Sequence, residues 1–427
     1  MKKHLLTAVT FCLILSFRPA QAQVYINELQ ASNSTTIADP ENSEYSDWLE
    51  LYNAGSSEAN ISGWRLSDSD DNMEWFVPSG TVIPSGGFLL IWADGADSGL
   101  HTNFGLSADG EQLTLYNAGG TSVDQIVFPE QLTDISLGRK TDGGSPWGYF
   151  SPSTPGASNT SGVFYKDYVR QVPVFSQSGG FYTGAVTIQL VDKYHAGTLR
   201  YTLDGSVPTT NSLVYVDPIV LSSTTVVKAR MFYTDQLPGP VVTNTYFINE
   251  GFDQRGLAVL SLSTNPEYFF GQDSGLYVQD FKPTWEYPVH LEFYEPDGLL
   301  GFHHDAGVQV GGENAWILPQ KLLNIYSRSQ YGSGHFDYQL FPNNPRKRFG
   351  DIILRCSGSD WSYTMFRDGM MQGLIGDEAD MDVQDFRPCL VYINGAYFGI
   401  HNIREKQDAE YTEEYHHIDP DSLDYIE

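Results

Sequence analysis

Basic residues are scarce in this chain of 427 amino acids. Lysine and arginine together number 24, against 53 aspartates and glutamates, and the formal net charge is −29. Because such a surface repels a phosphate backbone, we do not expect nucleic acid as a partner. We interpret the acidic residues as a solubilising surface, and recruitment of cations stays open.

Cysteine is rarer still, with Cys12, Cys356 and Cys389 as its three positions. The sequence has no zinc-type spacing, no cysteine–histidine nucleophile pattern and no Gly-x-Ser-x-Gly motif, so neither a metal site nor a common hydrolase is expected. Cys356 and Cys389 each lie beside an apolar, strand-like run. They could pair in an oxidising compartment or remain buried thiols, and both alternatives stay open.

Long apolar runs are absent beyond the N-terminus. Lys2 and Lys3 precede an apolar run that ends at Phe17, and Ala20-Gln21-Ala22 follows it. This pattern is typical of a bacterial secretory signal peptide, here over residues 1–22. No later stretch is long enough for a membrane span. We therefore expect a secreted, periplasmic or cell-surface protein without a membrane span.

Glycine and aromatic residues are abundant, with 41 glycines and 14% Phe, Trp and Tyr, whereas helical periodicity is scarce. Short apolar runs bounded by Gly, Asn and Asp predict a mainly β chain, and its length predicts several domains. The segment "SPSTPGASNTSG" at 151–162 is rich in Ser, Pro and Gly and lacks apolar periodicity. It predicts a linker between two β-rich units.

The first unit covers residues 23–155. Its order "INEL", "DWLELYNAG", "ISGWRLSD", "GGFLLIWADG" and "GEQLTLYN" resembles the lamin-tail domain, an immunoglobulin-like sandwich. This resemblance implies an attachment or spacer module and names no ligand. Asp68, Asp70 and Asn72 begin like a calcium loop, but Met73 and Ser79 occupy the positions of its glycine and glutamate. We interpret the segment as an Asp-rich turn.

The second unit covers residues 165–250. Its phrase "YTLDGSVPT", followed by "KARMF" and "TYFI", resembles the chitobiase/β-hexosaminidase C-terminal domain, another immunoglobulin-like sandwich. Asp204-Gly205 marks a turn that needs a positive φ. No paired carboxylates accompany it, so we expect a spacer, or alternatively a glycan-binding module.

The third unit covers residues 256–427 and adds helical periodicity to its strands. Phe366, Met370, Met371 and Leu374 share one predicted helical stripe. Asn394-Gly395 lies between two apolar-aromatic runs, which predicts a type I′ hairpin with positive φ at both residues. The returning strand ends at Arg404-Glu405-Lys406, and "DAEYTEEYHH" after it predicts a helix.

This order resembles the CotH family, the spore-coat protein H type of atypical protein kinases. The match is carried by Gly311-Gly312, Pro319-Gln320-Lys321, Leu354-Arg355, Arg367-Asp368 and "NGAYFGIHNIRE", which ends at Glu405. The resemblance implies ATP and Mg²⁺ as cofactors of a complete domain and a protein hydroxyl as acceptor. The expected fold class is mainly β multidomain: two immunoglobulin-like β-sandwiches followed by an incomplete α+β kinase-like domain.

Lys321 and Glu405 are the candidate cofactor-binding residues. The resemblance implies that Lys321 contacts nucleotide phosphates and that Glu405 lies near the nucleotide site. Alternatively, Lys321 is a surface lysine that extends over the hairpin, and Glu405 is an acid at a helix N-terminus. No catalytic residue is expected within this chain, because the family's Asp- and Asn-containing motifs would follow Glu427.

The remaining candidates have simpler interpretations. The pairs His303-His304 and His416-His417 have neighbouring side chains that point apart, so a shared metal is not expected. The basic segment "NNPRKRFG" at 343–350 is interpreted as a solvated turn. Two functions remain in competition: a CotH-type kinase in an exported modular protein, and a non-catalytic cell-surface adhesion or glycan-associated protein.

Overall fold

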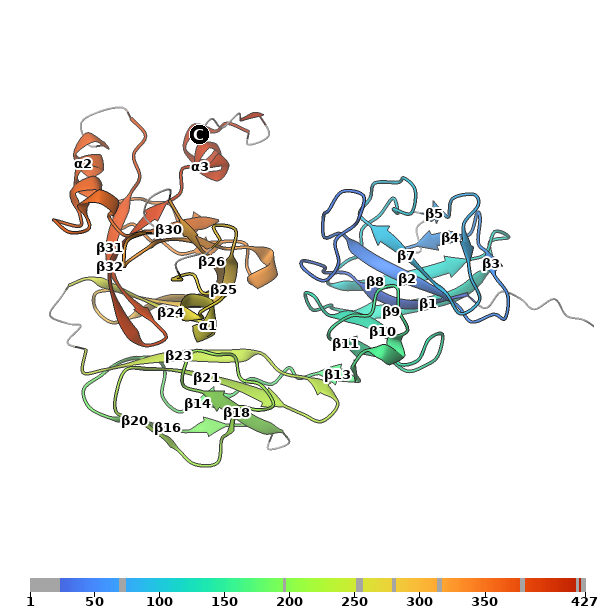
Figure 1. Cartoon of the computed structure of the whole chain (residues 1–427), viewed down its shortest axis with the longest axis horizontal. Coiled ribbons are helices and arrows are strands. Elements are labelled where there is room, and N and C mark those ends of the chain that lie inside the picture. The colour runs from blue at the N-terminus through green and yellow to red at the C-terminus, as the bar shows by residue number, and fades with distance from the viewer. Residues whose placement is uncertain are drawn as a thin grey trace, which may run out of the picture. The chain divides into compact units, whose positions relative to one another are not determined.

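The computed structural model describes residues 24–68, 74–194, 197–250, 256–278, 282–312, 317–376, 381–419 and 422–423. Its contacts divide the chain into two compact units, with the boundary between Asp167 and Tyr168 (Figure 1). The second of these units, from Tyr168 onward, includes both of the regions predicted above as the second and third units. The predicted mainly β multidomain fold is confirmed, because strands far outnumber helices and form many sheets. The predicted signal peptide, Asp70 and Asn72 lie outside the described residues.

The first unit contains two main sheets. A six-stranded sheet has the order β12-β11-β10-β1-β2-β7, a four-stranded sheet has the order β5-β4-β8-β9, and β3 pairs with β6. Apolar side chains such as Ile26, Leu49 and Leu115 are fully buried. The strands are β1 (Val24–Gln30), β2 (Asp47–Asn53), β3 (Ala59–Asn60), β4 (Arg65–Ser67), β5 (Glu74–Phe76), β6 (Val82–Ile83), β7 (Phe88–Ala93), β8 (Gly110–Tyr116), β9 (Ser122–Pro129), β10 (Ser136–Arg139), β11 (Trp147–Phe150) and β12 (Phe164–Tyr165).

The segment predicted as a linker is instead part of the first unit, so that prediction was wrong. The backbone N–H groups of Thr154 and Gly156 donate to the buried carboxylates of Glu28 (2.9 Å) and Glu50 (2.6 Å). Asn159, in the short 3-10 helix η1 (Asn159–Ser161), is also buried. These polar groups donate hydrogen bonds to acidic side chains buried in the sandwich. This explains why the segment lacks apolar residues and is nevertheless packed against the first unit.

The second unit begins with a smaller sandwich. Its largest sheet has the order β15-β23-β21-β18-β19, and short pairs join β14 to β17, β16 to β20 and β13 to β22. Its strands are β13 (Asp167–Tyr168), β14 (Val174–Phe175), β15 (Gly180–Tyr182), β16 (Val186–Ile188), β17 (Leu190–Val191), β18 (Thr198–Thr202), β19 (Leu213–Val214), β20 (Ile219–Leu221), β21 (Thr225–Phe232), β22 (Gln236–Leu237) and β23 (Val241–Ile248).

A closed barrel follows in the same unit, with the order β24-β25-β26-β27-β30-β32-β31 and the pair β28–β29 beside it. Its core holds Leu260, Leu291, Val308, Leu354 and Ile403. The strands are β24 (Ala258–Ser263), β25 (Glu286–Tyr294), β26 (Leu300–Gly311), β27 (Leu322–Tyr326), β28 (Phe336–Asp337), β29 (Arg348–Phe349), β30 (Asp351–Arg355), β31 (Phe386–Ile393) and β32 (Ala396–Glu405).

The helices that accompany the barrel include α1 (Pro266–Phe270), α2 (Arg367–Gly376) and α3 (Ala409–His416), and the short 3-10 helices η4 (Ser329–Tyr331) and η5 (Gly358–Asp360). The predicted helical stripe lies on or beside α2, and its four members, Phe366, Met370, Met371 and Leu374, are exposed. In the part of the chain that the structure describes, no helix is both long and apolar enough to cross a membrane.

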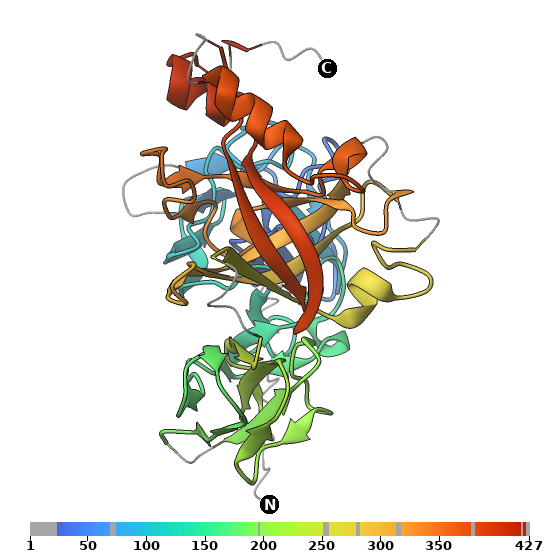
Figure 2. The same ribbon diagram turned by 90° about the vertical axis from the view of Figure 1, so that its left-hand side faces the viewer.

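The β31–β32 hairpin connects the two parts of the second unit. Its turn residues Asn394 and Gly395 have φ values of 49° and 82°, so the predicted positive-φ turn is confirmed. Asn394 accepts a hydrogen bond from Thr264 N–H at 2.9 Å and lies against Gly205, where a Cβ would come within 2.1 Å of the Asn394 side-chain oxygen. The tip therefore contacts the sandwich, and the strands run along the barrel to the end that carries α2 and α3 (Figure 2).

Candidate functional site

Strand β32 of the barrel ends at the candidate Glu405 and passes beside the candidate Lys321. Successive side chains of a strand alternate between its two faces, so His401, Ile403 and Glu405 share the face that includes the barrel core. Lys321 directly precedes β27, two residues before the core residue Leu323. Because Lys321 lies beside His401 and Glu405 is four residues further on, the two candidates are roughly 13 Å apart along the strand.

Lys321 precedes β27 and is 5% exposed. Its ammonium lies 5.4 Å from the centre of the Tyr277 ring, a distance at which a cation interacts with the face of an aromatic ring. Desolvation by burial lowers the pKa of Lys321. The alternative of an exposed lysine extending over the hairpin was therefore wrong.

The backbone at Lys321 is held by a neutral histidine. Burial lowers the pKa of His401 to about 4, so its ring is uncharged near neutral pH. Gln320 Nε2 donates to His401 Nδ1 at 2.9 Å, and His401 Nε2 donates to the carbonyl of Lys321 at 3.1 Å. Trp361 Nε1 donates to Gln320 Oε1 at 3.0 Å. This chain of bonds fixes the position from which the Lys321 side chain departs.

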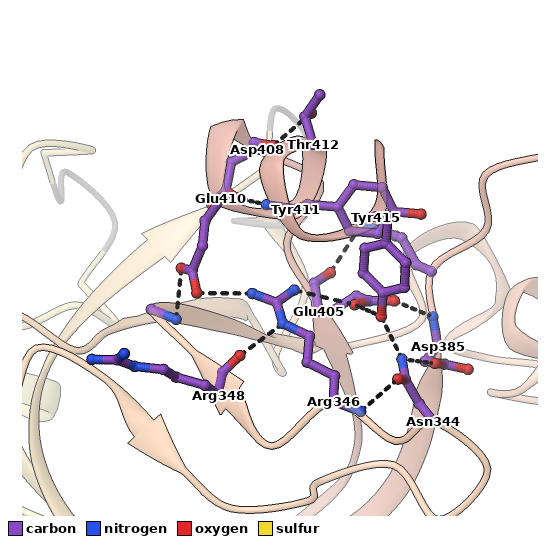
Figure 3. Close-up of polar contacts among 12 residues, drawn as sticks. Asn344, Arg346, Arg348, Asp385, Glu405, Asp408, Glu410, Tyr411, Thr412 and Tyr415 are labelled. Carbon is purple, nitrogen blue, oxygen red and sulfur yellow. Dashed lines mark hydrogen bonds and ion pairs between the residues drawn. The ribbon is translucent and has the colours of Figure 1, made fainter. Parts of the chain in front are cut away.

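Glu405, the last residue of β32, is 1% exposed and accepts hydrogen bonds from nearby donors of the chain (Figure 3). Asp385 N–H donates to Oε1 at 3.2 Å, and Tyr415 O–H donates to Oε2 at 3.1 Å. Arg346 Nη1 lies 3.6 Å from Oε2. Burial nevertheless raises the pKa of the Glu405 carboxyl, because desolvation outweighs these partners.

Arg346 is the centre of this network, and the prediction of a solvated basic turn was wrong at this residue. Arg346 is 8% exposed, donates from Nη2 to Glu410 Oε1 at 2.8 Å, and stacks over Phe349 at 4.6 Å. Its Nε donates to the carbonyl of Arg348 at 2.7 Å, which shapes the loop around the guanidinium. Figure 3 shows Arg346 between the Glu405 and Glu410 carboxylates.

The N-terminus of α3 is capped by Asp408 and not by Glu405. Asp408 Oδ1 accepts from Tyr411 N–H at 3.1 Å, and Glu410 lies in the first turn, where an acid favours the helix dipole. The alternative of Glu405 as a helix N-terminal acid was therefore wrong. Sequence reasoning missed Asp408 as the cap, although an Asp directly before a helical run is the usual signal.

A second charged cluster faces the outside of the barrel beside α2. Asp368 Oδ2 lies 2.8 Å from Arg355 Nε and 2.5 Å from Arg404 Nη2. Arg404 is 1% exposed and also donates to the carbonyl of Gln384 at 2.9 Å. The neighbouring Arg367 instead lies 3.3 Å from Asp360. These pairs attach α2 to strands β30 and β32.

The remaining candidates are accounted for individually. Cys356 and Cys389 are both buried free thiols, so the disulfide alternative was wrong. Burial raises the pKa of Cys389 to about 12. Among the histidines, His304 Nε2 lies 2.7 Å from Ser327 Oγ, and His416 Nε2 lies 2.9 Å from Asp382 Oδ1.

Three family models match separate parts of this chain. The model described as Lamin Tail Domain matches residues 18–130, Fn3 associated matches residues 186–246, and CotH kinase protein matches residues 309–426. No curated protein matches the chain. The chitobiase-type resemblance is not supported, since the middle segment matches Fn3 associated instead. The chain thus contains a lamin-tail domain and, in its second unit, a CotH kinase domain.

Proposed function

We propose that this chain belongs to an exported, modular, ATP-dependent protein kinase of the CotH type. In this proposal the barrel of the second unit binds the nucleotide. The observation that supports this best is the buried ammonium of Lys321 at the start of a barrel strand. A fixed lysine in a partly desolvated position offsets the charge of nucleotide phosphates more strongly than an exposed one does. The matched CotH region includes this residue.

The residues of the barrel fit the two implied cofactors unequally. Lys321 is suited to a phosphate group, and the neutral His401 fixes its backbone. Mg²⁺ needs oxygen ligands that converge, and the described barrel residues contain no cluster of three His, Cys, Asp or Glu ligand atoms. We therefore derive no step through Mg²⁺.

Glu405 is proposed as a positioning residue for the same site. Its carboxylate already receives Asp385 N–H and Tyr415 O–H and lies beside Arg346, so it ties the end of β32 to α3. A nucleotide near this end would contact a strand terminus whose direction Glu405 fixes. Replacement by Gln should weaken ATP binding less than loss of Lys321 does, and this difference separates positioning from direct contact.

The test is a titration of the chain with a fluorescent ATP analogue. Lys321→Met keeps most of the apolar stem and removes the ammonium, and should weaken binding about tenfold or more, the equivalent of about 1.4 kcal/mol. Lys347→Met, at an exposed position, is the matched control and should leave affinity unchanged. Circular dichroism checks that both variants fold. Equal affinities for the two variants would remove Lys321 from the nucleotide site.

A glycan-associated function is the second candidate, supported by a cavity within the second unit. The cavity measures about 750 Å³ and lies between the Fn3-associated sandwich and the barrel. Its lining includes hydroxyl, ring and charged groups, among them Thr209, Lys228, Tyr268, His290 and Asp305. A glycan array probed with the chain tests this function, and binding lost in Tyr268→Ala would favour it over a kinase role.

A further inference from the structure

The first unit contains a cluster of ligand atoms that the kinase proposal does not use. Asp39, Asp94 and His101 each place one carboxylate oxygen or ring nitrogen within 4.8 Å of the others, and this is the one such cluster among the described residues. Asp39 lies in the loop after β1, Asp94 directly follows β7, and His101 precedes β8. Residues far apart in the sequence therefore converge at one point of the lamin-tail sandwich.

Asp94 fixes the orientation of the His101 ring. Asp94 Oδ2 lies 2.7 Å from His101 Nδ1, and Asp94 Oδ1 accepts from Ala96 N–H at 3.0 Å. The backbone of His101 is also tied down, since its N–H donates to the carbonyl of Ser98 at 3.0 Å. In the neutral ring with Nδ1–H donating to this carboxylate, Nε2 carries the free lone pair, as in the histidine ligands of many zinc sites.

The free nitrogen of His101 faces two further carboxylates. Nε2 lies 3.8 Å from Asp39 Oδ2 and 3.6 Å from Glu41 Oε2. Ligand atoms around a tetrahedral zinc ion with bonds of about 2.0–2.1 Å are separated by about 3.3 Å. The two separations from His101 Nε2 are thus slightly wider than a bound ion requires. The Glu41 side chain is 73% exposed, so it is free to rotate toward an ion held between Asp39 and His101.

Asp39 gives an independent observation that points to a ligand. Its side chain is fully buried, and Oδ1 accepts from Glu41 N–H at 2.9 Å. Among the described residues, Oδ2 has no hydrogen-bond partner, and it lies 3.8 Å from the ring nitrogen. A buried carboxylate oxygen without a partner is costly, and a cation between it and the imidazole removes that cost.

We infer that Asp39 Oδ2, Glu41 Oε2 and His101 Nε2 form a binding site for a divalent transition cation of the Zn²⁺ class, with Asp94 as the carboxylate that orients the histidine. A set of one imidazole and two carboxylates suits Zn²⁺ better than Ca²⁺ or Mg²⁺, which prefer oxygen ligands alone. The fourth position is left to water. A bound ion would tie the loop after β1 to the segment that follows β7.

The test is calorimetric titration of the metal-free chain with Zn²⁺, together with the visible absorption of the Co²⁺ form. We expect one site, with Co²⁺ bands of a four-coordinate N/O complex. His101→Gln should abolish binding, and Asp94→Asn should weaken it about 10–100-fold, the usual effect of losing a partner that orients a ligand. His416→Gln is the matched control, because His416 also lies beside an aspartate, Asp382, and should bind Zn²⁺ like the parent chain.

Glu41→Gln keeps the test decisive if the buried variants fail to fold. Glu41 is 73% exposed, so its replacement should leave the sandwich intact while weakening Zn²⁺ about tenfold or more. Unchanged affinity in this variant would overturn the assignment. So would a parent chain without a Zn²⁺ site, because the cluster would then be an ion pair between His101 and its carboxylates.

Discussion

The Arg346 network allows a stability prediction with a built-in control. Arg346 and Glu405 expose 6% and 2% of their side chains, and their charged atoms are 3.6 Å apart. At an effective dielectric constant of about 20, attraction at this distance is about 4–5 kcal/mol before desolvation is subtracted. Removing one partner leaves the other charge buried, so Arg346→Met should lower the free energy of unfolding of the second unit by about 3–5 kcal/mol.

The neighbouring loop residue Arg348 is the matched control. Arg348 lies 3.8 Å from Asp337, and both side chains are largely exposed, at 65% and 72%. Surface pairs of this kind contribute about 0–1 kcal/mol, so Arg348→Met should change stability by less than about 1 kcal/mol. The two variants delete the same side-chain type from one loop, and their difference isolates the effect of burial.

Urea unfolding followed by hydrogen exchange measures both effects, with peptides from β32 and α3 reporting the second unit separately from the first. A double-mutant cycle with Glu405→Gln should give a coupling of about 1–3 kcal/mol, because the neutral amide no longer needs the guanidinium. Equal losses for Arg346→Met and Arg348→Met, or a coupling near zero, would refute the claim that Arg346 compensates the buried Glu405.

Three other predictions concern separate parts of the fold. Burial raises the pKa of Glu50 to about 8, so the folded chain retains a proton that the unfolded chain loses near 4.5. The stability of the first unit should therefore fall as the pH rises between these two values, by up to about 5 kcal/mol, and Glu50→Gln should flatten the curve in urea titrations. Burial lowers the pKa of Lys228 from 10.5 to about 8, so between these values the unfolded chain holds a proton that the folded chain has lost. The stability of the second unit should therefore rise by up to about 3 kcal/mol as the pH rises from about 8 to 10.5. Parallel pH curves for the parent chain and Lys228→Met would contradict this. Gly205→Ala should lower the melting temperature of the second unit, because Gly205 has a φ of 87° and no room for a Cβ beside Asn394; Gly373→Ala, in open space on α2, is the control.

Features set by local backbone chemistry could be predicted from the sequence. Asn394-Gly395 predicts its hairpin because few other residues adopt positive φ at both positions, and the structure has that turn. The mainly β architecture followed from period-2 patterns and turn residues, and the lamin-tail and CotH regions followed from motif order. Each of these signals is contained in a short stretch of chain or in the order of such stretches.

Features that depend on distant partners could not be predicted in this way. Arg346 is 64 residues from Glu410, and a basic loop with several charges is usually solvated. The helical stripe on α2 was read from periodicity alone, yet Met371 and Leu374 are exposed. Periodicity identifies which side chains share a face, whereas only the tertiary structure decides whether another element covers that face.

The polar segments that were misread share a physical cause. Glu28 and Glu50 are buried within strands β1 and β2 of the first unit, and Glu405 is buried at the end of β32 in the second. A buried carboxylate needs hydrogen-bond donors. The backbone N–H groups of the adjacent strands are already paired within the sheet, so they cannot supply all of these donors. The donors come from polar segments that pack back onto the sheet: residues 151–162 in the first unit and the Arg346 loop in the second.

An acid within an apolar strand is therefore a signal that hydropathy overlooks. It predicts that a polar segment elsewhere in the chain is buried, and it favours segments with free N–H groups or an arginine over segments with apolar residues. The same argument applies to Asp39 in the first unit, where only one of the two carboxylate oxygens receives a hydrogen bond from the described residues. Its Oδ1 receives Glu41 N–H, but among the described residues Oδ2 is buried without a hydrogen-bond donor and faces a histidine nitrogen. A cation is a favourable partner for a buried carboxylate that the described residues leave without a donor, and this is why we propose the metal site there.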